Sequence, residues 1–226
     1  MRTAILSSAG FIALCAVIAG HAQDFKFSQQ DEAAAAAEQA RQQAIAARLS
    51  TPCRAQLKNR KIMLVIGERQ TGGGISADQK NYGPHFQAIN QRLRALGLKT
   101  YTAEEIRQQI AQVEIDAYFR GDPDAALSAS RRLGASFVLR GLITTQTDVN
   151  RVINVNEVTV NMEFWLTGAD GRAISSATAH GGDYAGSDVR SVAARLIDEQ
   201  GDEVVAKLYS DYCANAGAAE PGRKKQ

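Results

Sequence analysis

Residues Arg131–Val149, RRLGASFVLRGLITTQTDV, decide the fold because a helix ends and a long strand begins within them. Gly134 follows Leu133 as a residue of the type that ends helices in a left-handed turn. The apolar run after it alternates between two faces with a period of two, which is typical of a strand. One face carries Phe137, Leu139, Gly141 and Ile143, and the other carries Val138, Arg140, Leu142 and Thr144.

Arg140 and Gly141 are neighbours in this strand and therefore belong to opposite faces. Gly141 removes a side chain from the apolar face, so we expect a helix or a strand bulge to pack closely there. Arg140 points away from that face, where it is either a simple rim residue or part of an interaction site. We therefore regard Arg140 as a candidate interaction residue.

A second strand follows, and its alternation is the clearest pattern in the chain. Apolar residues at 158, 160, 162, 164 and 166 alternate with a largely polar set, which predicts one buried and one solvated face. Asp170-Gly171 predicts a hairpin turn, with a return strand from Arg172 to about Thr178. Trp165 lies on the polar face and is a second candidate interaction residue. The alternatives are that Trp165 covers the sheet edge or packs beneath an N-terminal arm.

Helical and strand patterns alternate before this meander. They predict a helix at 28–49, a buried strand at 61–67, helices at 86–96, 102–113 and 123–133, a short strand at 98–102, and a final helix capped by Ser187. The expected fold class is therefore α/β (α+β). It is a mixed sheet of about five strands with helices packed on it, an antiparallel C-terminal meander and an N-terminal helical arm.

The N-terminus has the pattern of a secretory signal peptide. Met1 and Arg2 precede an apolar stretch that ends at Gly20 and Ala22, which predicts cleavage after Ala22 and a periplasmic protein. A membrane anchor is the alternative, but the apolar run is shorter than the roughly 20 residues of a spanning helix. Four segments are therefore expected: a signal at 1–22, an Ala/Gln-rich arm at 23–52, one α/β domain at 53–213 and a disordered tail at 214–226.

Two cysteines remain once residues 1–22 are removed. Cys53 precedes the first strand and Cys213 lies at the end of the last helix, so an exported chain is expected to join them in a disulfide. The alternative is two buried free thiols. Their spacing, with only His85 and His180 elsewhere in the remaining chain, matches no zinc site. No metal and no cofactor are expected.

Charge and motifs exclude several function classes. The net charge is +2, and +1 without Arg2, which does not predict nucleic-acid binding. Gly72–Gly74 form a loop after a strand, but Ile75-Ser76 follow where a phosphate-binding loop needs Lys and then Ser or Thr. His85 and His180 accompany no Gly-x-Ser-x-Gly motif or other nucleophile pattern. We therefore expect no enzyme, with Gly72–Gly74 as a candidate partner-binding loop.

The combination of these elements resembles a known family of envelope domains. The motifs that carry the resemblance are KIMLVIG with its glycine-rich loop, RLRALGLKTY, ASRRLGASFVLRGLI and the hairpin turn DGRAIS, between residues 58 and 212. They resemble the periplasmic α/β domain shared by the curli secretion channel subunit, the lipoprotein activators of penicillin-binding proteins, the flagellar outer-membrane accessory proteins and the N-terminal domain of TolB. The resemblance implies a protein–protein module of the bacterial envelope and transfers no individual functional residue.

Two functions from different classes follow as expectations. The first is a soluble periplasmic interaction module, an accessory of a cell-envelope assembly, whose partner is an envelope protein or a second copy of the chain. The second is a small-ligand binder or an enzyme that uses the Gly72–Gly74 cleft with His85. A ligand site should appear as a pocket with convergent polar groups beneath the loop. An interaction module should expose an apolar patch near Trp165 or along the arm.

Overall fold

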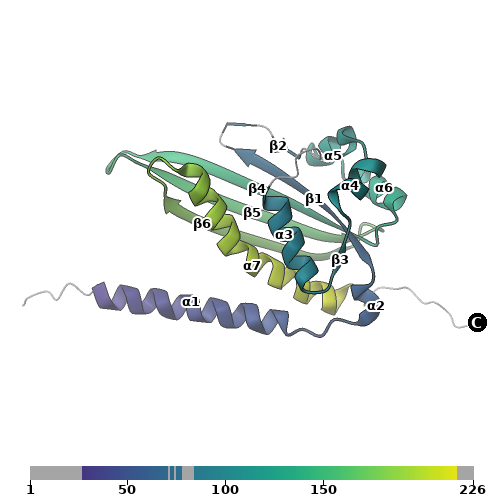
Figure 1. The fold of residues 1–226 in the computed structure, drawn as a ribbon, viewed down its shortest axis with the longest axis horizontal. Coiled ribbons are helices and arrows are strands. Elements are labelled where there is room, and N and C mark those ends of the chain that lie inside the picture. Colours follow the sequence, from purple (N-terminus) through teal and green to yellow (C-terminus); the bar gives the residue numbers. More distant parts are fainter. Residues whose placement is uncertain (1–26, 71, 74, 78–83, 218–226) are drawn as a thin grey trace, which may run out of the picture. The chain divides into compact units, whose positions relative to one another are not determined.

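The computed structural model describes residues 27–70, 72–73, 75–77 and 84–217, and the signal and tail expected at the two ends fall mainly outside these ranges. The described residues form one mixed sheet of six strands in the order β2-β1-β4-β5-β6, with β3 also beside β1 (Figure 1). The strands are β1 (Lys61–Gln70), β2 (Ile75–Ser76), β3 (Lys99–Thr100), β4 (Phe137–Asn150), β5 (Val155–Gly168) and β6 (Ala173–Tyr184). The expected mixed sheet and antiparallel meander are confirmed, since β4 runs parallel to β1 and antiparallel to β5, which is antiparallel to β6.

Seven helices lie within the described residues. They are α1 (Phe27–Leu49), α2 (Ala55–Lys58), α3 (Pro84–Ala95), α4 (Ala103–Gln109), α5 (Gln112–Phe119), α6 (Pro123–Leu133) and α7 (Val189–Asn215). The single helix expected at 102–113 is wrong, because Ile110 is extended and separates α4 from α5. This break allows Ile110 and Ile115 to be buried in the same cluster. The expected cap of α7 is also wrong by one residue, since Asp188 accepts the hydrogen bond from the Ser191 amide.

The two faces of the sheet have separate cores. The first face is the side that carries Leu139 and Ile143 of β4, and it packs with β5 and with α3 and α7 in the larger cluster. Figure 1 shows α3 and α7 lying along the sheet. The second face carries Val138, and it packs with α4, α5 and α6 in a smaller cluster that includes β1, the region of β2 and the start of β4. Neither cluster contains a helix that packs on the rest of the second face.

Gly141 allows an aromatic ring to fill the first face. The partner of Gly141 across the β4–β5 ladder is Phe164, which is fully buried. A Cβ atom on Gly141 would lie 2.3 Å from Cε1 of the Phe164 ring, which is closer than van der Waals contact permits. The expected close approach at Gly141 is confirmed, but the neighbour is a ring on the adjacent strand rather than a helix or a bulge.

The structure divides into two compact units, residues 1–38 and 39–226. In the first unit, the described residues form the beginning of α1, and residues 31–38 are exposed. In the second unit, the remainder of α1 binds α7. Ile45 is buried, Arg41 donates to the Glu199 carbonyl at 3.1 Å, and Arg48 lies 3.7 Å from the Glu203 carboxylate. No helix among the described residues has the length and hydrophobicity needed to cross a membrane.

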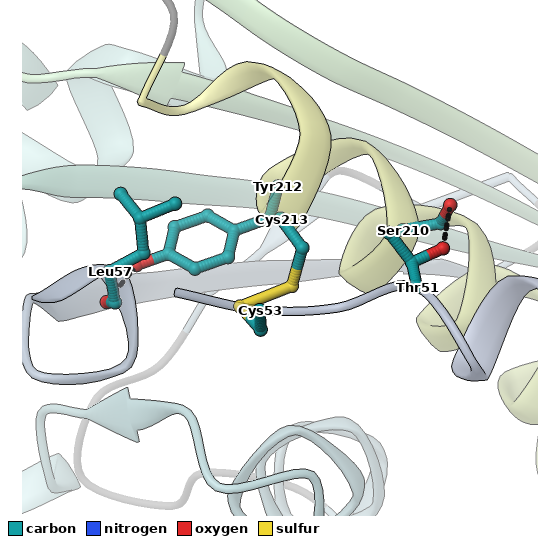
Figure 2. The surroundings of a disulfide bond; sticks show 6 residues. All are labelled: Thr51, Cys53, Leu57, Ser210, Tyr212 and Cys213. Carbon is teal, nitrogen blue, oxygen red and sulfur yellow. Dashed lines mark hydrogen bonds between the residues drawn. A yellow bond between two sulfur atoms is a disulfide. The ribbon is translucent and has the colours of Figure 1, made fainter. Parts of the chain in front are cut away.

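The disulfide between Cys53 and Cys213 ties the segment after α1 to the end of α7 (Figure 2). The expected pairing is confirmed: the two Cα atoms are 4.6 Å apart, and the cysteines are 160 residues apart in sequence. The Tyr212 hydroxyl donates to the Leu57 carbonyl beside it. The Tyr212 ring also packs edge-on against Phe137, with centroids 5.0 Å apart. The last turn of α7 is thus joined both to the segment before β1 and to the start of β4.

Burial raises the pKa of Tyr212 from 10.0 to about 12, so this tyrosine should make stability depend on alkaline pH. Because the folded state binds the proton more tightly, the contribution is fully present below about pH 10 and is lost as the pH rises to about 12. Tyr212→Phe should lower the free energy of unfolding by about 1 kcal/mol at pH 7, and the gap to wild type should shrink above pH 10. Urea unfolding across this pH range measures both effects. Tyr184→Phe, at an exposed tyrosine, is the control, and a constant gap for Tyr212→Phe would contradict the prediction.

Candidate functional site

The second face of the sheet is open beyond the small helical cluster. The first-face residues are buried from Phe137 to Ile143 on β4 and from Val158 to Gly168 on β5, whereas the second-face residues from Arg140 onward on β4 and throughout β5 keep part of their surface exposed. This pattern arises because alternate side chains of a strand point to opposite sides, and α4, α5 and α6 cover only one end. We call this surface the open face. Its residues are Arg140, Leu142, Thr144 and Gln146 of β4, Asn161, Glu163 and Trp165 of β5, and Ser176, Thr178 and His180 of β6.

Arg140 lies where the open face meets α5, among three aromatic rings. Its guanidinium carbon is 4.9 Å from the centroid of Trp165, 5.1 Å from that of Tyr118 and 5.6 Å from that of Phe119. Trp165 is the cross-strand partner of Arg140, and the other two rings end α5. Cation–π attraction at such distances contributes roughly 0.5–2 kcal/mol. Arg140 is therefore held in place by aromatic contacts, which its position in a strand did not predict.

Trp165 is half-buried rather than fully exposed. Its neighbours across the ladder are Arg140 on one side and Ser176 on the other. It lies on the opposite side of the sheet from Phe164 and hence from α7, the helix that residues 39–49 bind. Whether Trp165 takes part in an interaction stays a prediction, but its place beside Arg140 makes the two residues one site.

The glycine loop borders a second part of the open face. Gly72 and Gly73 line a cavity of about 200 Å³ with Arg69 and Gln70 of β1 and with residues 144, 146 and 148 of β4. These β4 positions have the same strand parity as Arg140, so the cavity opens on the same side of the sheet. From Arg140 to Thr144 the strand advances about 13 Å. Gly74 lies outside the described residues.

His85 is not part of this cavity. Its Nδ1 atom lies 2.7 Å from Oε1 of Glu68, but without the geometry of a hydrogen bond. Glu68 precedes Arg69 in β1, so the two side chains point to opposite faces and His85 lies on the first face. His180 bonds to Asn161 at 2.7 Å on the open face. His85 therefore lies on the other side of the sheet from the loop cleft with which the alternative ligand-site hypothesis paired it.

Metal chemistry has no support among the residues that the structure describes. They contain no group of three or more His, Cys, Asp or Glu side chains that could hold a metal ion. Cys53 and Cys213 are joined in the disulfide and are therefore not available as ligands.

The largest exposed apolar side chains gather at one end of the sheet. Val149, Val152 and Ile153 lie at the turn between β4 and β5, with Val152 92% exposed, and Tyr184 ends the neighbouring β6. We call these four residues the hairpin tip. The turn is ordered, because the Asn150 side chain accepts from the Val152 amide at 3.1 Å. Among the described residues, Val113 is the other large apolar side chain that is mostly exposed.

Our expectation of an apolar patch near Trp165 or along the arm missed this surface. The hairpin tip lies about nine residues along β5 from Trp165, or roughly 30 Å. The signal was present in the sequence VNRVINV, where aliphatic residues alternate with Asn and Arg between two strands that already have full apolar faces. Aliphatic residues at a turn have no sheet to pack against, so their exposure could have been inferred. Tyr118 and Phe119 carried no such signal, since their contact with Arg140 depends on the packing of α5.

Comparison with known proteins identifies similar structures but no family. No family model matches the sequence, and no curated protein matches it. One similar solved structure is the hypothetical protein CT253 from Chlamydia trachomatis, with 14% identity and a TM-score of 0.44 over 69% of this chain and 99% of that one. Another is the LpoB C-terminal domain from Salmonella enterica, with 15% identity and a TM-score of 0.38 over 62% and 93%. The PelC dodecamer from Paraburkholderia phytofirmans has 20% identity and a TM-score of 0.37 over 69% and 93%.

These similarities concern the arrangement of helices and strands, and at such identities and TM-scores they transfer no function. The family resemblance that the sequence motifs suggest stays a prediction.

Proposed function

We propose that this protein is a periplasmic protein–protein interaction module, an accessory of a cell-envelope assembly. The observation that carries the proposal is the hairpin tip, where Val152 and Ile153 are exposed in the turn and Val149 and Tyr184 are exposed on the adjoining strand ends. Single exposed apolar residues are common on protein surfaces, but a group of them at one place is typical of a binding surface. A projecting tip of this kind fits an apolar depression on a partner protein.

Two further observations agree with this role. The Cys53–Cys213 disulfide is typical of an oxidising compartment such as the periplasm. The open face, with Trp165 and Arg140 at one end, continues the exposed surface along β4 and β5 from the hairpin tip. Tryptophan and arginine are enriched at protein interfaces.

Small-ligand binding is the second candidate function, and the cavity beside Gly72 and Gly73 is the observation that favours it. Its volume of about 200 Å³ is smaller than the roughly 300–1,000 Å³ of ordinary ligand pockets. It is also lined by no large apolar or aromatic side chain, whereas such side chains predominate in ordinary ligand pockets. The hairpin tip therefore supports an interaction module better than the cavity supports a ligand site.

In-cell photo-crosslinking tests the proposed function. A photoreactive amino acid at Val152 should capture a discrete envelope protein, or a second copy of the chain if the protein self-associates. The same amino acid at Arg94, an exposed residue of α3, is the control. An absence of adducts from position 152, or the same adducts from both positions, would overturn the proposal.

Substitution at the hairpin tip should weaken binding without loss of stability. Val152→Ser with Ile153→Ser removes two aliphatic side chains, which together contribute roughly 2–3 kcal/mol when buried in an interface. The affinity for the captured partner should fall about 30- to 150-fold, measured by titration calorimetry or, for self-association, by ultracentrifugation. Because both side chains are exposed in the free protein, the melting temperature should stay within about 2 °C. Val113→Ser, at an exposed valine on α5, should leave both values unchanged.

A further inference from the structure

The Arg140 guanidinium differs from most charged groups of the described structure, because it lies among aromatic rings rather than beside a carboxylate. Among the residues that the structure describes, no carboxylate forms an ion pair with Arg140, and its buried Nε has no hydrogen-bond acceptor. Among the same residues, half-buried Arg92 is compensated by Asp198 and Asp202, whereas Arg172 resembles Arg140 in having a buried Nε without an acceptor. An unpaired buried donor costs about 1–3 kcal/mol, which cation–π attraction offsets only in part. The buried Nε is out of reach of a ligand, so a ligand could pair with this cation only through its terminal nitrogens.

The three rings determine which direction remains available to a ligand. The guanidinium carbon lies 4.9–5.6 Å from the ring centroids of Tyr118, Phe119 and Trp165. These rings therefore fill the positions beside the guanidinium that a stacking ligand would otherwise take. Arg140 keeps part of its surface exposed on the open face, so its terminal nitrogens can be approached there. Two parallel N–H groups at the edge of a guanidinium match the two oxygens of a carboxylate.

The surroundings of Arg140 indicate a peptide rather than a small free anion. The site lies on a sheet face and not in a closed cavity, and half-buried Leu142 and Trp165 offer apolar contact beside the charge. Glu163, two residues from Trp165 on the same face and about 7 Å along the strand, adds negative charge that opposes an anion bound without such contacts. The side chain is also immobilised before binding, which lowers the entropic cost of recognition.

We propose that Arg140 and its aromatic cage bind a carboxylate of an acidic peptide segment of a partner protein. This inference names the chemistry of a partner and to that extent rests on the proposed function, but it concerns a different surface from the hairpin tip. In-plane pairing of the guanidinium with the carboxylate would satisfy the terminal donors, and apolar residues next to the acidic one would pack on Trp165 and Leu142.

Trp165 supplies the measurement, because it is the single tryptophan of the chain. The purified protein is titrated at low salt with acetyl-Leu-Glu-Leu-amide and with its glutamine analogue acetyl-Leu-Gln-Leu-amide, with tryptophan fluorescence as the readout. The acidic peptide should bind about 10-fold more tightly than the neutral one. Equal affinity for the two peptides would overturn the proposal. Tighter binding of inorganic phosphate than of the acidic peptide would overturn the carboxylate assignment.

Three variants and a control separate charge, geometry and folding. Arg140→Gln should abolish the preference for the acidic peptide, and Arg140→Lys should lose most of it because lysine cannot pair bidentately. Glu163→Gln removes a competing charge at an exposed position, so it should strengthen acidic-peptide binding about two- to threefold without affecting folding. Arg94→Gln, at an exposed arginine of α3, should change nothing. An unchanged preference in Arg140→Gln, or weaker binding in Glu163→Gln, would contradict the site. These assays use peptides in vitro and are independent of crosslinking at Val152. Failure of peptide binding would therefore leave the proposed function standing, and failure of crosslinking would leave the peptide site standing.

Discussion

Replacement of both Cys53 and Cys213 by alanine should lower the free energy of unfolding by about 4–5 kcal/mol. The bond closes a loop of 160 residues, and its main effect is to restrict the unfolded chain, so the loss grows with loop length. The expected loss is a large fraction of the stability of a domain of this size. Urea denaturation at pH 7 measures it directly, and a loss below about 1 kcal/mol would show that the bond does not constrain the unfolded state as proposed.

Reduction provides the matched control for the disulfide variant. Wild-type protein in a reducing agent should unfold at the same urea concentration as the double-alanine variant, and the variant should not respond to the reducing agent. The segment that carries Thr51 and Cys53 is held against α7 partly by the Thr51–Ser210 hydrogen bond of 2.9 Å (Figure 2). We therefore expect the native fold to persist without the bond, at lower stability.

Gly141→Ala should lower the free energy of unfolding by about 2–3 kcal/mol, although the added group is a single methyl. The new Cβ would lie 2.3 Å from Cε1 and 2.8 Å from Cδ1 of Phe164, so the buried ring must move. The interior there is closely packed and offers the ring little space. Gly182→Ala in β6 is the control, because its added Cβ would meet the Val158 carbonyl only at an ordinary 3.6 Å.

A double-mutant cycle shows whether the ring is the cause. Phe164→Leu alone should destabilise the protein, because it leaves a cavity. In the Gly141→Ala background the same change should cost less, or should restore stability, because the smaller side chain relieves the collision. Additive losses in the double variant would show that Gly141 is required for a reason other than contact with Phe164.

Local patterns predicted the strands well where one face is buried and the other is not. Val158, Met162 and Phe164 recur at every second or fourth position, and a strand is the structure that places such residues on one side. The helix expected at 102–113 failed at Ile110, because no local signal opposes a helix there and the break serves packing around α5. Local propensity is weak enough for tertiary contacts to override it.

For the candidate site, the sequence likewise indicated single residues, whereas their proximity came from the tertiary structure. Arg140, Trp165 and Gly72 were each recognised in the sequence as unusual for their surroundings, but as unrelated features. The sheet order brings them to one side, because β1 and β5 flank β4 and their alternate residues share a face. The same geometry assigned His85 to the other side through Glu68.

The sequence by itself determined most of the helices and strands, the two faces of β4 and β5 and the pairing of the only two cysteines after Ala22. These follow from periodicity and from the small number of partners, which are local or combinatorial constraints. The tertiary structure alone decided that Phe164 requires a glycine opposite it, that Tyr118 and Phe119 surround Arg140, and that the hairpin tip is exposed. Such contacts join residues distant in the chain, and they exist only once strand register and helix packing have been established.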